Sequence, residues 1–407
     1  MNQTDARLIF GARLVRLFAY GFLAVALFLY LNARGFDDAT IGLLLSLTLL
    51  GDAGISLWLT TQADRFGRKR TLIIGALLMT FAGILFAFTD NFFVLAFAAI
   101  VGVISPSGNE IGPFLSVEQA ALSQLLPDTQ RTRIFAWYNL VGSFATAGGA
   151  LAGGALAQLL QNNGWSTLDS YRVVVIGYAV FGIILAALFT FLSPIVELPS
   201  NLVRPDGLSR LGLHKSQGVV LKLSALFALD AFAGALVVQS IIAYWFHQKF
   251  GLDAGALGAL LFGANILAGI SALSAARLAR KFGLLNTMVF THLPSNILLM
   301  LVPFMPNVWL AVAVLLVRFS ISQMDVPTRQ SYTMAVVAPD ERSAASGVTT
   351  IARSVGAAIA PALSGQLLAM PAFISAPFLI AGGLKVVYDL ALFQQFRAHK
   401  PPEEIKS

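Results

Sequence analysis

The sequence predicts an all-α membrane protein with twelve transmembrane helices, arranged as two pseudo-symmetric bundles of six. Hydrophobic residues make up 57% of the 407 residues and charged residues 12%, a composition too apolar for a water-soluble surface. Apolar runs of about 20 residues, enough to cross roughly 30 Å of hydrocarbon as a helix, recur along the chain. Matching residues separated by 216 positions relate the two halves, so the protein is a duplicated unit.

The apolar runs fall into two sets of six. Lipid leaves only helices or closed barrels as spanning structures, and these runs are too long and continuous for the alternating strands of a barrel. The expected spans begin near Leu8, Thr40, Thr71, Phe92, Ile134, Tyr171, Val219, Ala254, Leu284, Trp309, Ala344 and Ala376. The predicted organisation is an N-terminal bundle of residues 1–193, a cytoplasmic linker of residues 194–218, a C-terminal bundle of residues 219–396 and a cytoplasmic tail of residues 397–407.

Basic residues predict the orientation. Most Lys and Arg residues lie in the tails or in the connections that follow even-numbered spans, whereas Arg34, Arg172 and Lys249 lie on the opposite side. By the positive-inside rule both termini are cytoplasmic, in what we expect to be a plasma membrane, the inner membrane of a bacterium. The net charge of +7 then reflects topology and contact with anionic lipid, and no nucleic-acid partner is expected.

The residues give little support to an enzyme. There is no Gly-Lys dipeptide and hence no Walker A loop, no Gly-x-Ser-x-Gly elbow and no His-Glu-x-x-His pair. The absence of cysteine excludes structural disulfides and thiolate chemistry and removes the best ligands for soft metals. We therefore expect no catalysis, no cofactor and no metal site.

A basic loop between the second and third spans carries the most specific motif, Asp64-Arg65-Phe66-Gly67-Arg68-Lys69-Arg70. Gly67 permits a tight turn between antiparallel helices, and the basic cluster holds the loop in the cytoplasm. The motif resembles the signature loop of the major facilitator superfamily, which the repeat of six plus six spans suggests independently. The resemblance implies a cytoplasmic latch that joins the two halves in the outward-facing state, formed by Asp64, Arg65, Gly67 and Arg68.

The motif departs from the family pattern in two places. Thr60 stands where the family usually has glycine, and the second copy of the loop has Arg280 in place of the acid and Leu284 in place of the second arginine. Only the first copy is therefore expected to form the latch. A basic loop that serves topology alone is the alternative.

The fourth span is expected to be broken. Its repeat partner is about five residues shorter, and the extra residues lie within Ser105–Pro113, which contains two prolines and two glycines. A break at membrane depth is tolerated only against protein or a water-filled cavity, which would place Asn109 and Glu110 on the transport path. The alternative is a break at the inner membrane surface that begins an interfacial helix.

The fifth span contains the glycine-rich stretch Gly148-Gly149-Ala150-Leu151-Ala152-Gly153-Gly154. It resembles a degraded form of the antiporter motif of the facilitator-type drug/proton exporters, with Ala150 where that motif has proline. The alternative is that the small residues only let helices pack closely.

Charged residues in the spans gather on particular helices. In facilitator transporters the first, fourth, seventh and tenth helices line the central cavity, and eight of the twelve charges placed in or at the edges of spans fall on them here. The candidates for proton coupling are Asp230, Glu118 and Glu110. The candidates for the substrate cavity are Arg16, Asp52, Asn109, Arg318, Asp325, Arg329 and Gln330. Lys385 and Asp389, four residues apart on one helix, are expected to form a structural pair.

These observations predict a monomeric secondary transporter in the lipid bilayer that exports a small organic compound in exchange for protons by alternating access. One alternative is an importer, by symport or uniport, of an anionic metabolite with Arg16 and Arg329 as ligands. Another, from a different class, is a receptor or scaffold that keeps the transporter fold without coupling.

Overall fold

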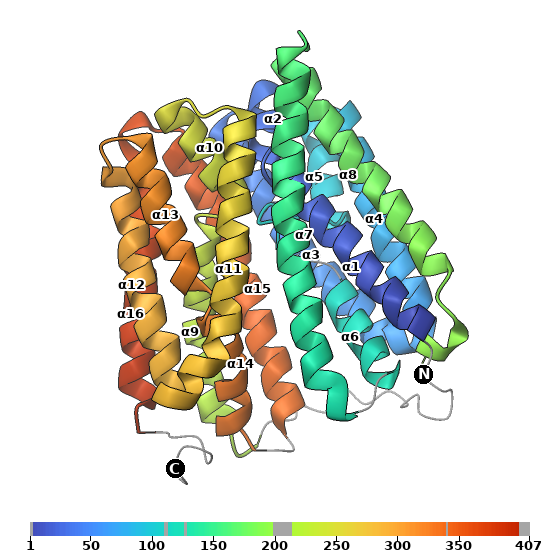
Figure 1. Ribbon diagram of the computed structural model, residues 1–407, viewed down its shortest axis with the longest axis vertical. Helices are drawn as coiled ribbons and strands as arrows, with labels where there is room; N and C mark the ends of the chain where they lie inside the picture. Colours follow the sequence, from blue (N-terminus) through green and yellow to red (C-terminus); the bar gives the residue numbers. More distant parts are fainter. Residues whose placement is uncertain (1–2, 110–112, 126–127, 198–213, 339–340, 399–407) are drawn as a thin grey trace. The chain divides into compact units, whose positions relative to one another are not determined.

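The computed structural model describes residues 3–109, 113–125, 128–197, 214–338 and 341–398, which are largely helical (Figure 1). The helices of the first half are α1 (Gln3–Ala24), α2 (Leu27–Ala33), α3 (Asp38–Phe66), α4 (Arg68–Phe88), α5 (Phe92–Val101), α6 (Phe114–Leu125), α7 (Asp128–Asn162), α8 (Thr167–Thr190) and the 3-10 turn η1 (Pro194–Val196). Those of the second half are α9 (Gln217–Ala235), α10 (Gln239–Phe250), α11 (Ala254–Phe282), α12 (Leu284–Leu301), η3 (Val302–Phe304), α13 (Val308–Ser322), α14 (Asp325–Val336), α15 (Arg342–Leu368), η5 (Pro371–Phe373) and α16 (Ala376–Phe396).

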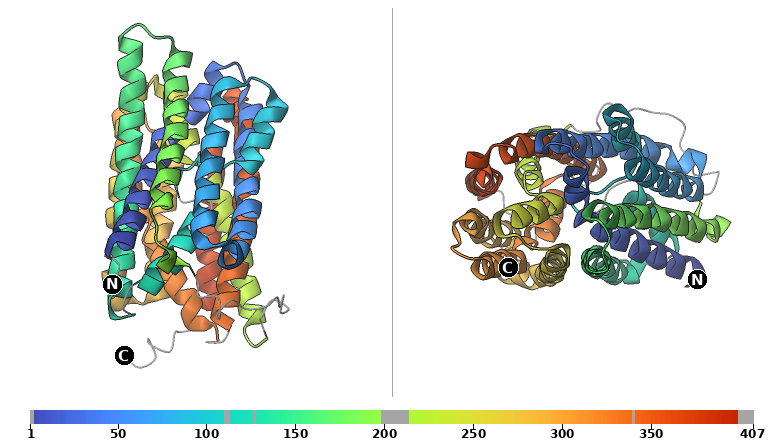
Figure 2. Two further views of the ribbon diagram at one scale, coloured as in Figure 1. Left: turned by 90° about the vertical axis from the view of Figure 1, so that its right-hand side faces the viewer. Right: turned by 90° about the horizontal axis from the view of Figure 1, so that it is seen from above.

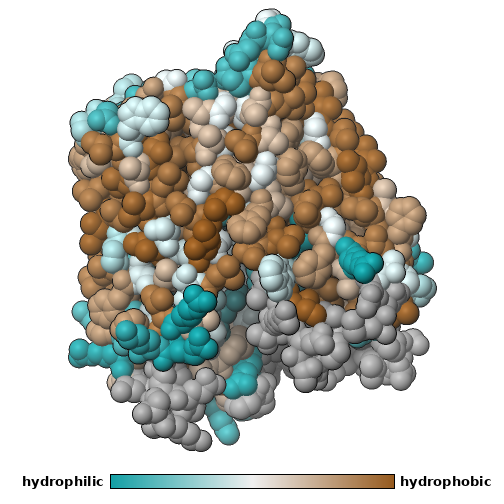
Figure 3. Space-filling model, in the orientation of Figure 1, coloured by the Kyte–Doolittle hydropathy of each residue, from teal (hydrophilic) through white to brown (hydrophobic). Residues whose placement is uncertain are grey.

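The helices account for the twelve predicted spans in chain order. Within the described residues, ten stretches are long and apolar enough to cross a membrane. The first span is the pair α1 and α2, bent by 41°, and the fourth consists of α5 and α6 on either side of a break. On the face drawn in Figure 3, hydrophobic residues cover the flanks of the helices and hydrophilic residues gather towards their ends. The all-α membrane fold is thus confirmed.

The residues that repeat between the two halves begin and end helices. Asp37 and Asp253 precede α3 and α11, and their carboxylates accept the backbone N–H groups of residues 40 and 256 at 2.7 and 2.8 Å. Asn91 and Asn307 cap α5 and α13 through their side-chain oxygens. The sequence repeat therefore corresponds to a repeat of helix boundaries in the structure.

Two further repeated residues are the glycines that end the second and eighth spans. Gly67 and Gly283 have φ of +97° and +85°, a conformation that side chains with a Cβ rarely adopt. Each joins two helices without an intervening loop: α3 to α4 in one case, α11 to α12 in the other. The tight turn predicted for Gly67 is confirmed.

Packing divides the chain into two units that differ from the sequence halves. Unit 1 comprises Met1–Pro205 together with Val238–Phe262, and unit 2 comprises Asp206–Val237 and Gly263–Ser407. Within unit 1, the ring of Tyr244 on α10 stacks on Phe28 of α2 at a centroid distance of 4.1 Å. The Tyr244 hydroxyl donates to Asp38 of α3 at 2.7 Å. The second helix of the seventh span, α10, is therefore built into the first unit.

Close helix contacts in each unit depend on small residues. Figure 2 shows α7 and α8 side by side, and α7 also packs along α1. A Cβ on Gly149 or Gly153 of α7 would overlap the backbone of Phe18 or Phe22 of α1. In unit 2, a Cβ on Gly356 of α15 would likewise overlap a carbonyl of α9. The glycines of the fifth span therefore have a packing role, which was the alternative to an antiporter motif.

Candidate functional site

In the described parts of the chain, four spans are interrupted, and they are the first, fourth, seventh and tenth. The interruptions lie between α1 and α2, between α5 and α6, between α9 and α10 and between α13 and α14. In the fourth span, the ten residues of α5 rise about 15 Å, half of the roughly 30 Å of hydrocarbon. The break therefore begins near the middle of the span, at a depth where freed backbone groups need partners.

Partners for the described part of this break come from other helices of unit 1. The hydroxyl of Tyr178 on α8 donates to the carbonyl of Val103 at 2.5 Å, and the N–H of Ser240 on α10 donates to the carbonyl of Pro106 at 3.1 Å. Gly108 has a φ of +67°. Asn109 is exposed and Glu110 lies outside the described residues. The predicted break is confirmed, and at these two carbonyls it is satisfied by protein.

A buried ion pair joins the first and fourth spans in unit 1. Arg16 of α1 donates to both carboxylate oxygens of Glu118 on α6, at 2.5 and 2.9 Å, and neither side chain is exposed (0% each). Tyr138 of α7 donates its hydroxyl to the same carboxylate, and the Arg16 guanidinium lies 4.6 Å from the ring centroid of Phe114. This bidentate geometry supplies the hydrogen bonds that a buried ion pair requires.

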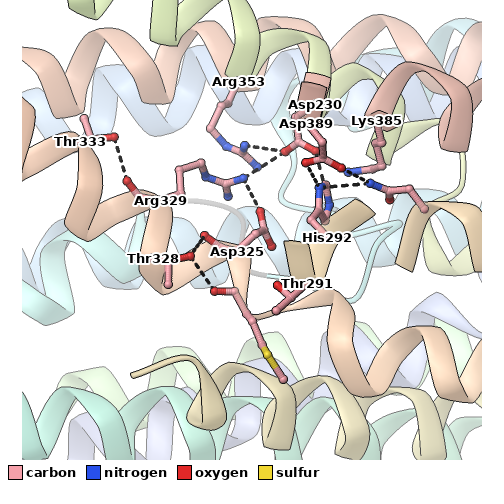
Figure 4. Close-up of polar contacts among 12 residues, drawn as sticks. Asp230, Thr291, His292, Asp325, Thr328, Arg329, Thr333, Arg353, Lys385 and Asp389 are labelled. Atoms are coloured by element: carbon pink, nitrogen blue, oxygen red, sulfur yellow. Dashed lines mark hydrogen bonds and ion pairs between the residues drawn. The ribbon is translucent and has the colours of Figure 1, made fainter. Parts of the chain in front are cut away.

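Unit 2 contains a larger network centred on Asp230 of α9 (Figure 4). Lys385 of α16 donates to Oδ1 of Asp230 at 2.5 Å. Arg329 of α14 and Arg353 of α15 donate to Oδ2 at 3.1 and 3.0 Å. Asp230 and Lys385 are buried, and the Arg353 side chain is 33% exposed. One carboxylate thus connects four helices of the unit.

Two other carboxylates complete this network. Asp325 pairs with Arg329, one turn further along α14, at 2.8 Å. Asp389 of α16 contacts Nδ1 of His292 and accepts from Asn296 of α12, both at 2.9 Å. His292 Nε2 lies 3.9 Å from Asp230. Polar contacts therefore connect α12 to the other helices of the network.

The expectation of a Lys385–Asp389 pair was wrong about the partners. Lys385 donates to Asp230 on α9, while Asp389 is hydrogen-bonded to side chains of α12. The spacing of four residues places both on one face of α16, but that face is covered by helices that offer stronger partners. His292 is hydrogen-bonded to Asp389.

The two units hold corresponding ion pairs of opposite polarity. In unit 1 the cation, Arg16, is on the first span and the carboxylate, Glu118, is on the fourth. In unit 2 the carboxylate, Asp230, is on the seventh span and the cation, Arg329, is on the tenth. In the sequence, Glu118 and Arg329 are each followed by glutamine and occupy comparable places in the two halves. The structure adds that each pairs with the first span of its own half.

The remaining cavity candidates are less closely connected. Asp52 of α3 accepts a hydrogen bond from Ser56 one turn later, at 2.7 Å. Gln330 is exposed on α14, whereas Arg318 is buried on α13. In the described part of the chain, no group of three or more His, Cys, Asp or Glu side chains is placed to hold a metal ion.

The predicted latch loop is described in part, because the side chains of Asp64 and Arg65 lie outside the described residues. Arg68 is buried and donates to Gln124 of α6 at 2.9 Å and to the carbonyl of Val196 at 3.2 Å. Glu197 accepts the backbone N–H groups of Arg68 and Lys69 at 2.6 and 3.1 Å. A carboxylate thus occupies the positive end of α4.

A glutamate plays a similar part in unit 2. Glu341 accepts the backbone N–H groups of His214, Lys215 and Ser216, just ahead of α9, at 2.6 to 2.8 Å. Burial raises the pKa of Glu341, but the hydrogen bonds from Lys215, His214 and Ser216 outweigh it and hold the pKa at about 2.

Sequence reasoning missed several residues of the two networks. Arg353, Lys385, His292, Asn296 and Tyr138 were not chosen as site residues. All but Tyr138 belong to the ninth, eleventh and twelfth spans, which the resemblance did not place on the cavity. For Arg353, Lys385 and His292 the signal was available in the sequence, since ionisable residues within spans indicate function wherever they occur.

Comparison with known proteins identifies the family. A sequence profile of the Major Facilitator Superfamily matches residues 9–361 and 223–406. The membrane protein YJR124C of Saccharomyces cerevisiae is 30% identical over 421 residues, covering 96% of this chain and 94% of its own. The quinolone resistance protein NorA of Staphylococcus aureus is 22% identical over 404 residues, covering 98% of both chains.

Solved structures agree in fold. A variant of the nucleoside transporter NupG superposes with a TM-score of 0.77 at 14% identity, covering 96% of this chain and 99% of its own. A D-xylose-proton symporter gives a TM-score of 0.72 at 14% identity, covering 96% and 98%. With the family profile spanning nearly the whole sequence, the chain is a multi-pass membrane protein that belongs to the major facilitator superfamily of transporters.

Proposed function

We propose that this protein is a secondary transporter that exports a small organic compound in exchange for protons by alternating access. The observation that carries the proposal is Asp230, a buried carboxylate shared by Lys385, Arg329 and Arg353 from three other helices. Neighbouring cations stabilise the charged form of a carboxylate, and their departure favours proton uptake. Asp230 therefore has partners whose rearrangement could link protonation to conformation.

In the proposed cycle, the proton and the transported compound occupy the protein alternately. On the outer side Asp230 takes up a proton, its ion pairs with Arg329 and Lys385 break, and the substrate is released. On the inner side the proton is released, the ion pairs form again, and the substrate binds. Glu118, whose partners are Arg16 and Tyr138, is the second candidate for the same role in unit 1, and Glu110 is the third.

Export is supported by sequence similarity. NorA, which by its name confers quinolone resistance, matches this chain over nearly its full length, and α7 keeps several glycines of the antiporter motif. We further propose a plasma membrane location, cytoplasmic termini, a monomer and a cytoplasmic latch formed by Asp64, Arg65, Gly67 and Arg68.

Transport by inverted membrane vesicles tests the proposal. Compounds that raise the melting temperature of the purified protein supply the substrates, and uptake is measured with an imposed pH gradient and after a protonophore collapses it. Asp230→Asn is expected to lose gradient-driven uptake and to keep exchange of substrate down its own gradient. Asp90→Asn is the matched control, because Asp90 pairs with Arg34 but its side chain is 81% exposed.

The same assay distinguishes the proposed exporter from the two alternative functions. An importer of an organic anion, favoured by the arginines buried in both units, would accumulate substrate in right-side-out vesicles. A receptor or scaffold would bind the compound without flux in either orientation. Gradient-driven uptake by Asp230→Asn at the wild-type rate would remove Asp230 from the coupling mechanism.

A further inference from the structure

Arg318 is a buried cation that forms no ion pair with any residue that the structure describes. It lies in the last turn but one of α13, about 15 Å along that helix, and is 8% exposed. Asp325 and Asp230 are close enough to interact with it electrostatically, but among the described residues no carboxylate lies within the ion-pair distance of 4.0 Å. Its Nε is buried without a hydrogen-bond partner, and its guanidinium carbon lies 4.7 Å from the ring centroid of Phe319.

The carboxylates near Arg318 are already engaged. Asp230 bonds to three other cations and Asp325 bonds to Arg329. With Arg318 and the partly exposed Arg353, the network therefore contains four cations, but only three carboxylates when Asp389 is included. Without counting His292, one positive charge remains. Such a charge at membrane depth is costly unless a ligand or water compensates it.

A second polar group on the same helix face also lacks a partner. Ser322 follows Arg318 by four residues, so the two side chains lie on one face of α13. Ser322 is 3% exposed and its hydroxyl makes no hydrogen bond in the described structure. The next helix, α14, begins three residues later and its N-terminus has no side-chain cap, which adds a positive dipole end. Two unused donors thus lie beside an excess positive charge.

The internal repeat gives Arg318 no counterpart. At the offset of 216 residues its equivalent is Gly102, which packs against Ala82. Duplication of a structural feature therefore does not account for a buried arginine at this position.

We propose that Arg318 and Ser322 form a subsite for the anionic group of the transported compound, and that the substrate class is an organic monocarboxylate. A carboxylate can accept a hydrogen bond from the guanidinium and from the hydroxyl at once, and one negative charge neutralises the network. This inference rests on the proposed transport function, but it concerns binding and holds for either direction of transport.

Binding to the purified full-length protein tests the subsite. Acetate, nicotinate and benzoate are each compared with their amides, which have nearly the same shape and no charge. Thermal shift and quenching of tryptophan fluorescence provide the dissociation constants. We expect at least one carboxylate to bind the wild type and its amide to bind at least tenfold more weakly.

Substitutions test whether the carboxylate binds at Arg318 and Ser322. Arg318→Met is expected to weaken carboxylate binding at least tenfold, Arg318→Lys to weaken it less, and Ser322→Ala to weaken it several-fold. Arg172→Gln is the control, because Arg172 pairs with Asp169 in a partly exposed contact. Its binding constants should equal those of the wild type.

The melting temperature of the ligand-free protein shows whether Arg318→Met loses binding because it is misfolded. Because the Arg318 charge is uncompensated, Arg318→Met should melt at the same temperature as the wild type or higher. A lower melting temperature would show a structural role and overturn the proposal. So would wild-type protein that binds none of the carboxylates, equal binding of the amides, or unchanged binding by Arg318→Met. Loss of proton-driven flux in vesicles, by contrast, bears only on the proposed transport mode, since this assay uses no gradient.

Discussion

The contact between Asp230 and Lys385 allows a quantitative test of the unit 2 network. Asp230→Asn keeps the shape of the side chain but leaves three cations without their shared carboxylate. Removing one partner of a buried ion pair typically costs about 3–5 kcal/mol. Lys385→Met removes only the bond to Oδ1, because Arg329 and Arg353 bond to Oδ2. Loss of one charged hydrogen bond costs about 1.5–3 kcal/mol.

The double variant distinguishes a coupled network from independent residues. Without Lys385, an asparagine at position 230 leaves one fewer unpaired cation, so the double variant should be more stable than the sum of the single losses predicts. For residues in direct contact the difference is about 1–3 kcal/mol. Should Asp230→Asn alone fail to accumulate in the membrane, the double variant should recover part of the expression.

Unfolding in mixed detergent micelles supplies the free energies, with the five tryptophans as the probe. Asp230→Asn combined with Lys222→Met is the control cycle, because Lys222 is exposed on the same helix. In this control cycle, the losses of unfolding free energy caused by the two substitutions should add. Additivity within about 0.5 kcal/mol for Asp230 and Lys385 as well would refute the view that the carboxylate and the amine stabilise the unit as a pair.

Four further results are expected. Asp64→Asn should slow transport with membrane insertion unchanged, and transport at the wild-type rate would contradict the latch. Cysteine at Asn109 should react with water-soluble maleimides at a rate that substrate alters, because the residue is exposed beside the break; indifference to substrate would place it off the transport path. Gly149→Val should cost about 3 kcal/mol or more of folding free energy by overlapping a backbone carbonyl of α1, whereas Gly148→Ala, which meets only a ring at 3.9 Å, should be nearly neutral in the same unfolding assay. The pKa of Glu341 is lowered from 4.5 to about 2, so its stabilising effect is complete above pH 4.5 and is lost as the pH falls towards 2; the stability difference between wild type and Glu341→Gln should narrow over that range, and a constant difference would be evidence against the assignment.

The fold was predictable because its signals are local or repeated. Span length, the basic loops and the 216-residue repeat each follow from the chain without knowledge of neighbours. The break in the fourth span was visible because Pro106 and Pro113 cannot continue a helix. The interruptions after Ala24 and Ala235 have neither glycine nor proline within them, so neither was predicted.

Side-chain partners were harder to predict. The spacing of Lys385 and Asp389 shows what can meet along one helix but not what faces that helix from α9 and α12. Asp230 and Glu118 were placed within spans from the sequence, but their partners were not predicted: Arg353 lies 123 residues from Asp230, and Tyr138 lies on the helix that follows Glu118. A pairwise contact between distant segments leaves no trace in a single sequence.

The assignment of Val238–Phe262 to unit 1 affects how the protein is made. A ribosome that has completed residue 205 has delivered most of unit 1, but not α10, whose Tyr244 stacks on Phe28. After the first six spans have been inserted, the surface of α2 that contacts α10 therefore stays uncovered until the seventh span has been synthesised and inserted. For the same reason, two fragments expressed separately and divided at the linker would not correspond to the two units. The first fragment would lack α10, and unit 1 would be complete only after α10 of the second fragment had packed against it.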